Sequence, residues 1–128
     1  GEIDIMHHVG YDPDNVFFSI HNANLYGNVG GTNQQGIYYL NGLETDFHTY
    51  SVEWDSTRIR GFVDGNLYFN YNKSGSSNYN SWPYDSPFFL IINLAIGGEW
   101  GGQQGIDNSI FPASFIIDYA RMFKKAGS

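Results

Sequence analysis

The chain has 128 residues, with 13 Asp and Glu against 6 Lys and Arg, a formal net charge of −7, and no cysteine. This length fits one ordinary domain, the acidic balance argues against nucleic acid and membranes as partners, and the lack of cysteine excludes disulfides and thiolate chemistry. With 10 Phe, 10 Tyr, 3 Trp and 16 Gly but only 15% charged residues, the composition favours a folded, all-β protein.

Alternating apolar and polar residues predict strands along most of the chain, and no stretch has the periodicity of an amphipathic helix. After the N-terminal run, the predicted strands are residues 16–22, 36–40, 47–54, 58–63, 66–71, 88–96 and 114–123. Asp64-Gly65 predicts a two-residue hairpin turn, because glycine adopts the positive φ of a type I′ turn. Residues 88–96 are almost continuously apolar, which predicts a central strand covered on both faces. Seven to eight strands indicate an antiparallel β-sandwich or jelly roll.

The first eight residues, GEIDIMHH, contain the densest group of side chains suited to acid–base chemistry. In an extended strand Glu2 and Asp4 share one face, opposite Ile3 and Ile5. Repulsion between the two carboxylates is expected to raise the pKa of one of them, as acid–base catalysis often requires. On this pattern alone, a solvent-facing edge strand with scattered acids is the alternative interpretation.

The runs GEIDIM and HVGYDPDNV resemble the active-site strand of glycoside hydrolase family 16, specifically its laminarinase-like endo-β-1,3-glucanases. The resemblance extends through FHTYSVEW, FVDGNLYF, WPYDSPFFLIINLAIGGEWGGQQGIDNSIFP and FIIDYARMF, and so covers nearly the whole chain. It implies a concanavalin A-like jelly roll with a concave cleft, a β-glucan polysaccharide or oligosaccharide as partner, no required cofactor, and an extracellular or periplasmic location. Family catalytic domains are roughly twice this long, so residues 1–125 would be the C-terminal half of such a domain and 126–128 an added linker tail.

The family motif reads E-x-D-x-x-E. By resemblance, Glu2 stands at the position of the nucleophile, Asp4 at that of the carboxylate that tunes and orients it, and His7 at that of the general acid/base glutamate. The outer motif positions are five residues apart and would face opposite ways in a regular strand, so a one-residue β-bulge is expected to return them to one face. Because losing a general acid/base typically removes ~10²–10⁴-fold of rate, we expect severely impaired hydrolysis with glucan binding retained.

Three explanations for His7 are open: an engineered substitution in an enzyme, a natural loss in a binding relative, or a new site on an old scaffold. A new site could be a metal site that combines His7 or His8 with His21 and Glu2, since imidazole and carboxylate suit Zn, Fe or Ni. No regular ligand spacing supports such a site. Otherwise His8 is expected to be a satisfied surface or cleft side chain.

The predicted strand 16–22 departs from the family pattern at Phe17 and Phe18, which stand where relatives usually have a polar and a very small residue. One of the two is expected to fill the core, because adjacent strand residues face opposite ways. The other could obstruct a sugar subsite. His21 matches the second family histidine, which implies a place near the acid/base position and a part in substrate binding.

Further candidate residues lie in the second half of the chain. Trp100, in a loop with five glycines, is the favoured platform for stacking against a sugar ring. Asn93 is the one amide in an apolar run and is expected to face the cleft, and Glu99 and Gln103 would line its rim. Asp118 matches a family aspartate that often binds structural calcium, for which hard oxygen ligands are suited.

Trp54 and Trp82 are expected to pack inside the protein. Strands next to absent neighbours would expose unpaired edges, so we expect self-association or a companion N-terminal segment to complete the fold. The leading hypothesis is a laminarinase-like domain with a compromised retaining site. The alternatives are a non-catalytic β-glucan-binding module and an engineered scaffold or self-assembling half-domain without native activity.

Overall fold

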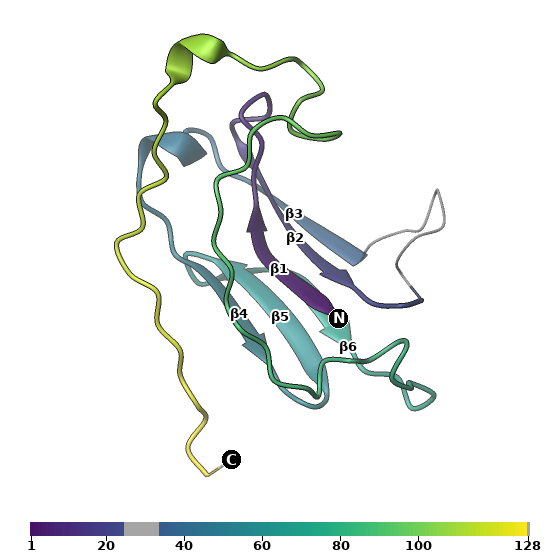
Figure 1. Cartoon of the computed structure of the whole chain (residues 1–128). Coiled ribbons are helices and arrows are strands. Elements are labelled where there is room, and N and C mark those ends of the chain that lie inside the picture. The colour runs from purple at the N-terminus through teal and green to yellow at the C-terminus, as the bar shows by residue number, and fades with distance from the viewer. Residues whose placement is uncertain (25–33, 128) are drawn as a thin grey trace. The chain divides into compact units, whose positions relative to one another are not determined.

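The computed structural model describes residues 1–24 and 34–127, and the chain forms two compact units, Gly1–Leu90 and Ile91–Ser128. Residue 128 of the predicted linker tail lies outside the described residues. The first unit contains all the described strands (Figure 1), which are β1 (Glu2–His7), β2 (Asn15–His21), β3 (Gln34–Tyr39), β4 (Tyr50–Trp54), β5 (Arg58–Val63) and β6 (Asn66–Asn72). A 3₁₀ turn, η1 (Leu43–Thr45), lies between β3 and β4.

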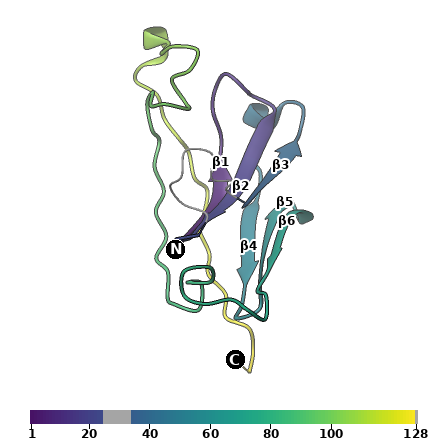
Figure 2. The same cartoon turned by 90° about the vertical axis from the view of Figure 1, so that its right-hand side faces the viewer.

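The second unit is irregular. Its one described regular element is the 3₁₀ turn η2 (Asn108–Ile110), and Figure 2 draws the rest of residues 91–127 without arrows. The strands predicted at residues 88–96 and 114–123 are therefore wrong. A strand exists only where a neighbour accepts and donates its backbone hydrogen bonds, and within the described residues neither segment has a paired strand. No helix in the described part of the chain has the length and apolarity of a membrane span.

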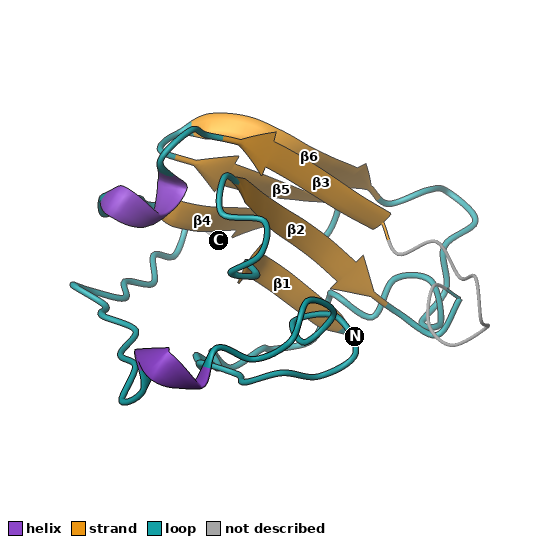
Figure 3. Ribbon diagram, turned by 90° about the horizontal axis from the view of Figure 1, so that it is seen from above, coloured by secondary structure: helices purple, strands orange, loops and turns teal. Residues whose placement is uncertain are grey.

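The six strands form two antiparallel sheets, ordered β1-β2-β3 and β4-β5-β6. Seen from above, β3 lies beside β6, and β1 lies at the far end of its own sheet (Figure 3). The buried side chains between the sheets come from both of them and from the segment after β6, and they are Phe18, Ile20, Ile59, Phe69, Trp82 and Tyr84. The predicted antiparallel β-sandwich is confirmed.

The side chains of strand β2 point alternately into the core and toward the opposite face of its sheet. Val16, Phe18 and Ile20 are fully buried in the core, and alternation directs Phe17, Ser19 and His21 to the other face. The prediction that one of two adjacent phenylalanines fills the core is thus confirmed for Phe18. Its ring stacks on that of Phe69, with centroids 4.5 Å apart.

Two glycines permit the close approach of neighbouring strands. A Cβ on Gly61 of β5 would lie 2.7 Å from Cε2 and 2.9 Å from Cγ of the Phe18 ring. A Cβ on Gly36 of β3 would lie 2.5 Å from the carbonyl oxygen of Tyr68 in β6. All three separations are shorter than non-bonded atoms tolerate, so these positions require the absence of a side chain.

The predicted Asp64-Gly65 turn joins β5 to β6. Asp64 has φ 49° and Gly65 has φ 79°, the two positive values that a type I′ turn requires. Burial disfavours the ionised Asp64 carboxyl, but hydrogen bonds from the Thr49 amide (2.8 Å) and the His48 ring (2.7 Å) outweigh it and hold the pKa of Asp64 below its usual value. The turn is thereby tied to the residues just before β4.

The two tryptophans of the first unit have different environments. Trp82 is 3% exposed and stacks on Tyr71 at 5.8 Å, so its predicted structural role is confirmed. Trp54 is 38% exposed and makes an edge-to-face contact with the Phe88 ring, at 6.4 Å between centroids. The prediction that Trp54 lies in the core is wrong, because this last residue of β4 keeps more than a third of its surface exposed.

Candidate active site

A β-bulge in β1 defines the candidate site. Pairing with β2 runs from Glu2↔His21 to Asp4↔Ser19 and resumes at His7↔Phe17, so β1 advances three residues while β2 advances two. One residue of β1 is therefore extra, and the side chains of Asp4 and His7 come to the same face. His7 Nε2 lies 3.5 Å from Asp4 Oδ1. The one-residue bulge expected from the motif spacing is confirmed.

Asp4 is at the centre of the group and is largely enclosed, with 9% of its side chain exposed. Its Oδ2 accepts a 2.8 Å hydrogen bond from the Ser19 hydroxyl and lies 2.8 Å from His21 Nε2. Its Oδ1 faces His7. Asp4 thus has fixed partners on both oxygens, which locks the orientation of its carboxyl group.

Ser19 was not singled out from the sequence. It is a buried polar residue between two fully buried apolar neighbours, Phe18 and Ile20. Buried hydroxyls require a partner, and here the partner is Asp4. A serine that interrupts a buried apolar run on the strand next to the acids was the available signal.

Glu2 lies at the more exposed end of the group. A hydrogen bond with the Asp4 carboxyl, partial burial and repulsion from the charge of Asp4 raise the pKa of Glu2 above its usual value, while charge on His21 and His7 opposes the shift. The expectation that crowding raises the pKa of one of the two carboxyls is confirmed. Glu2 and His21 also line an open pocket of about 270 Å³ with Gly1, Asn22 and Ala23.

The backbone beneath His21 is anchored from the core side. The Tyr84 hydroxyl donates to the His21 carbonyl oxygen at 2.9 Å, and the Asn22 amide donates to the Ser81 carbonyl oxygen at 3.0 Å. Burial raises the pKa of Tyr84 to about 12, so its hydroxyl stays protonated and able to donate. These bonds fix the backbone at the end of β2 and so help to place the His21 ring beside Asp4 Oδ2.

His8 does not join the group. Its Nδ1 lies 2.9 Å from the Asn15 carbonyl oxygen, and its Nε2 lies 2.6 Å from Glu44 Oε1. The prediction that His8 is a satisfied side chain is confirmed. Of the two adjacent histidines, the bulge puts His7 on the acidic face.

Five of the site residues predicted from the sequence belong to the second unit. They are Asn93, Glu99, Trp100, Gln103 and Asp118. Trp100 and Gln103 share one turn, in which the Gln103 amide donates to the Trp100 carbonyl oxygen at 3.2 Å. Asn93 does not lie on a described strand, and the expectation that it faces the cleft stays a prediction. The sugar-binding roles of these residues and the calcium at Asp118 stay predictions.

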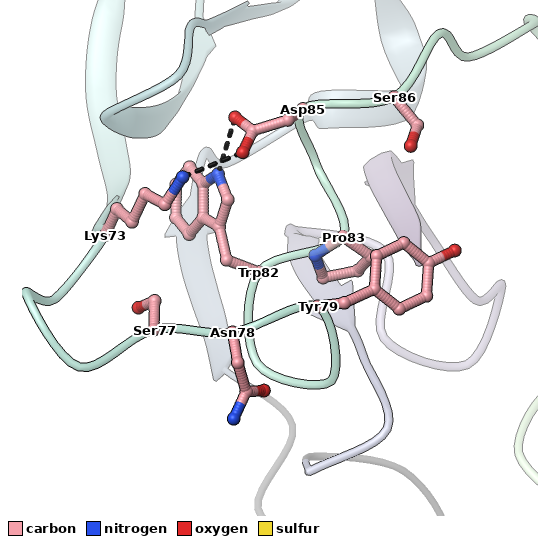
Figure 4. Close-up of a pocket in the computed structure, with 8 residues that line it drawn as sticks. All are labelled: Lys73, Ser77, Asn78, Tyr79, Trp82, Pro83, Asp85 and Ser86. Atoms are coloured by element: carbon pink, nitrogen blue, oxygen red, sulfur yellow. Dashed lines mark hydrogen bonds and ion pairs between the residues drawn. The ribbon is translucent and has the colours of Figure 1, made fainter.

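A second pocket, of about 250 Å³, lies in the segment between β6 and the end of the first unit (Figure 4). Lys73 Nζ lies 2.7 Å from Asp85, and the indole nitrogen of Trp82 donates to the same carboxylate at 3.1 Å. The lysine and aspartate neutralise each other, and the indole is buried. This arrangement closes a loop and offers no pair of groups for acid–base chemistry.

The site thus gathers two carboxyls and two imidazoles on one face of a β-sandwich, and glycosidases act through paired carboxyl groups. The family model for glycosyl hydrolases family 16 matches residues 1–121. A β-glucanase of Rhodothermus marinus is 43% identical over 128 residues, which cover 97% of this chain and 44% of that protein. The chain belongs to glycoside hydrolase family 16.

Solved structures agree with this assignment. The laminarinase of Rhodothermus marinus has a TM-score of 0.79 and 42% identity, over 86% of this chain and 45% of the other. A mutant of a non-specific endo-β-1,3(4)-glucanase of the family, with serine in place of a glutamate, has a TM-score of 0.77 and 40% identity, over 85% of this chain and 42% of that one. It presents 1,3-β-D-cellobiosyl-glucose at its active site. The chain thus spans less than half the length of these relatives.

Proposed function

We propose that this chain supplies the catalytic strand and part of the glucan-binding surface of a retaining endo-β-1,3-glucanase, in a form with severely impaired hydrolysis. The observation that supports the proposal is the bulge in β1, which puts Asp4 and His7 on one face, 3.5 Å apart, beside Glu2. The similarity to a β-glucanase over nearly the whole chain supports the substrate class.

In this mechanism Glu2 is the nucleophile. Its carboxylate attacks the anomeric carbon, the bond from that carbon to the leaving oxygen breaks, and a glycosyl ester forms on Glu2. Asp4 orients Glu2 through their hydrogen bond, and is itself held by Ser19 and His21. Water then cleaves the ester, and the sugar keeps its anomeric configuration.

His7 stands where the proton-transfer group must act. As an imidazolium it would donate its proton to the leaving oxygen, and as a neutral ring it would take a proton from the attacking water. Two features make it a poor substitute for a carboxylic acid. Its ring has a different reach, and its Nε2 faces the Asp4 carboxylate at 3.5 Å. We expect a rate ~10²–10⁴-fold below that obtained with glutamate at this position.

Glucan binding is the function that persists when proton transfer fails. The related endo-β-1,3(4)-glucanase with a glutamate replaced by serine presents a sugar at its active site, which supports binding without an intact set of acids. A non-catalytic β-glucan-binding module is therefore the second candidate function, and His7 is the observation that favours it. A scaffold without native activity is the third.

Two properties of the whole protein follow from the same proposal. We expect an extracellular or periplasmic location, where β-glucan polymers are accessible. We also expect a companion N-terminal segment, or a second copy, to complete the sandwich. The greater length of the relatives and the exposure of apolar residues such as Ile37 and Leu67 of the first unit support this expectation.

The test is calorimetric titration of the chain with laminari-oligosaccharides, paired with an assay of reducing ends. We expect saturable binding, and we expect Glu2→Gln to bind the sugar while losing any residual hydrolysis. Cellulose oligosaccharides and a galactan serve as comparison ligands. Absence of saturable binding to every glucan would refute both the enzyme and the binding-module proposals.

A further inference from the structure

The face that holds the candidate active site also presents a set of metal donors. Glu2 and Asp4 offer carboxylate oxygens, and His21 offers an imidazole nitrogen. One atom from each of these three residues lies within 4.8 Å of the other two. We propose that Glu2, Asp4 and His21 form a binding site for a divalent transition metal ion, with zinc as the best fit, and that His7 supplies the fourth donor.

The spacing of the donors fits a small ion. Zinc bonds of about 2.0–2.2 Å in a tetrahedral arrangement place ligand atoms roughly 3.3–3.6 Å apart. His21 Nε2 and Asp4 Oδ2 are 2.8 Å apart and must separate slightly, while Glu2, the most exposed of the three and within 4.8 Å of the other two donors, must move inward by at most about 1.5 Å. Both movements are side-chain rotations that leave the strand pairing intact.

His7 decides which ions the site prefers. Its Nε2 lies 3.5 Å from Asp4 Oδ1, the carboxylate oxygen that does not face His21, so the His7 ring must turn toward Oδ2 to join the ion held by the other three residues. A glutamate at this position would make three carboxylates and one imidazole. With His7 the set is two carboxylates and two imidazoles, which suits zinc, nickel or copper and disfavours calcium and magnesium.

Neighbouring residues hold Asp4 and His21 in place, and an open pocket gives an ion access to the site. The Ser19 hydroxyl donates to Asp4, and the Tyr84 hydroxyl holds the backbone of His21. Such outer contacts fix the orientation of metal ligands. The open pocket beside Glu2 and His21 is a route from solvent. Within the described residues no other group of three potential ligands meets the same distance criterion.

Metal and glucan would compete for the same carboxylates. An ion held by Glu2 and Asp4 removes the nucleophile and its orienting partner from use. The proposal itself rests on donor atoms and distances and not on the proposed hydrolase function, so the experiment measures metal binding directly, with no sugar present.

Tag-free protein is stripped with a chelator and titrated with zinc against a fluorescent competitor chelator. We expect one zinc ion per chain, weakened at least about tenfold by His7→Gln and further by His21→Gln. The matched control is His8→Gln, because His8 adjoins His7 in sequence but faces Asn15 and Glu44. Calcium at the same concentration is expected not to displace zinc.

Circular dichroism of each variant establishes that its fold is retained. The proposal is overturned if the wild-type chain shows no saturable zinc binding. It is overturned equally if His8→Gln weakens binding as much as His7→Gln does, because zinc would then be held elsewhere. Displacement of zinc by equimolar calcium would contradict the assigned donor set.

Discussion

Replacing Gly61 with alanine tests how closely the two sheets are packed. The new Cβ would lie 2.7 Å from Cε2 and 2.9 Å from Cγ of Phe18, whereas carbon atoms in contact are normally about 3.5–4.0 Å apart. The Phe18 ring is stacked on Phe69 at 4.5 Å and meets the edge of Tyr68 at 6.0 Å, so it has no free space to enter. The sheets must therefore separate or the ring must leave its preferred rotamer.

Overpacking of this kind costs about 1–3 kcal/mol of unfolding free energy. In a domain of this size each kcal/mol lowers Tm by roughly 4–8 °C. Urea unfolding followed by tryptophan fluorescence measures the loss. Gly75→Ala is the matched control, because a Cβ on Gly75 meets nothing within 4 Å. It is expected to change stability by less than about 0.5 kcal/mol.

A double-mutant cycle isolates the contact from general effects of alanine. If the Phe18 ring causes the loss, Gly61→Ala should cost much less in a Phe18→Leu background than in the wild-type chain. Equal stability of Gly61→Ala and Gly75→Ala would refute the packing argument. So would an undiminished cost of Gly61→Ala after Phe18→Leu.

Three further variants have defined outcomes. Asp64→Asn keeps a residue that tolerates positive φ. The pKa of Asp64 is lowered in the folded chain. The ionised carboxyl therefore stabilises the fold at pH values above its unfolded pKa of about 3.9, and this stabilisation is lost as the pH falls through the folded pKa. Wild type should thus lose more unfolding free energy than this variant below about pH 4, and parallel pH profiles would contradict the prediction. Tyr84→Phe removes the bond to the His21 carbonyl and should cost about 0.5–1.5 kcal/mol in urea unfolding; no loss would show that this carbonyl needs no partner. Ser19→Ala removes one of the two partners of Asp4 Oδ2 and should weaken zinc binding about tenfold, whereas unchanged affinity would argue against its positioning role.

The features predicted correctly from the sequence are those set by local chemistry. Asp64-Gly65 specifies its own turn, and the adjacent pair Phe17 and Phe18 must divide between two faces of β2. The bulge in β1 was expected from the spacing of the family motif, because two side chains five residues apart face opposite sides of a regular strand. Each of these depends on a few neighbouring residues.

The features that were missed depend on residues distant in the sequence. The apolar residues of the run 88–96 indicate that it tends to be buried. A strand also needs a hydrogen-bonded neighbour, and the sequence of the run alone cannot show whether one is present. The contacts of Asp4 with Ser19 and His21 depend on the register between β1 and β2. That register could not be assigned from either strand alone, so Ser19 was overlooked.

The most direct test of the central claim is the rate of reducing-end release from laminarin by the wild-type chain and by His7→Glu, compared under identical conditions. The position of His7 beside Asp4 and Glu2 predicts that glutamate raises the rate ~10²–10⁴-fold, with laminari-oligosaccharide affinity little changed. His8→Glu is the matched control and should give no gain, since that side chain faces Glu44. No increase for His7→Glu, or an equal increase for His8→Glu, would contradict the assignment of His7 to the proton-transfer position.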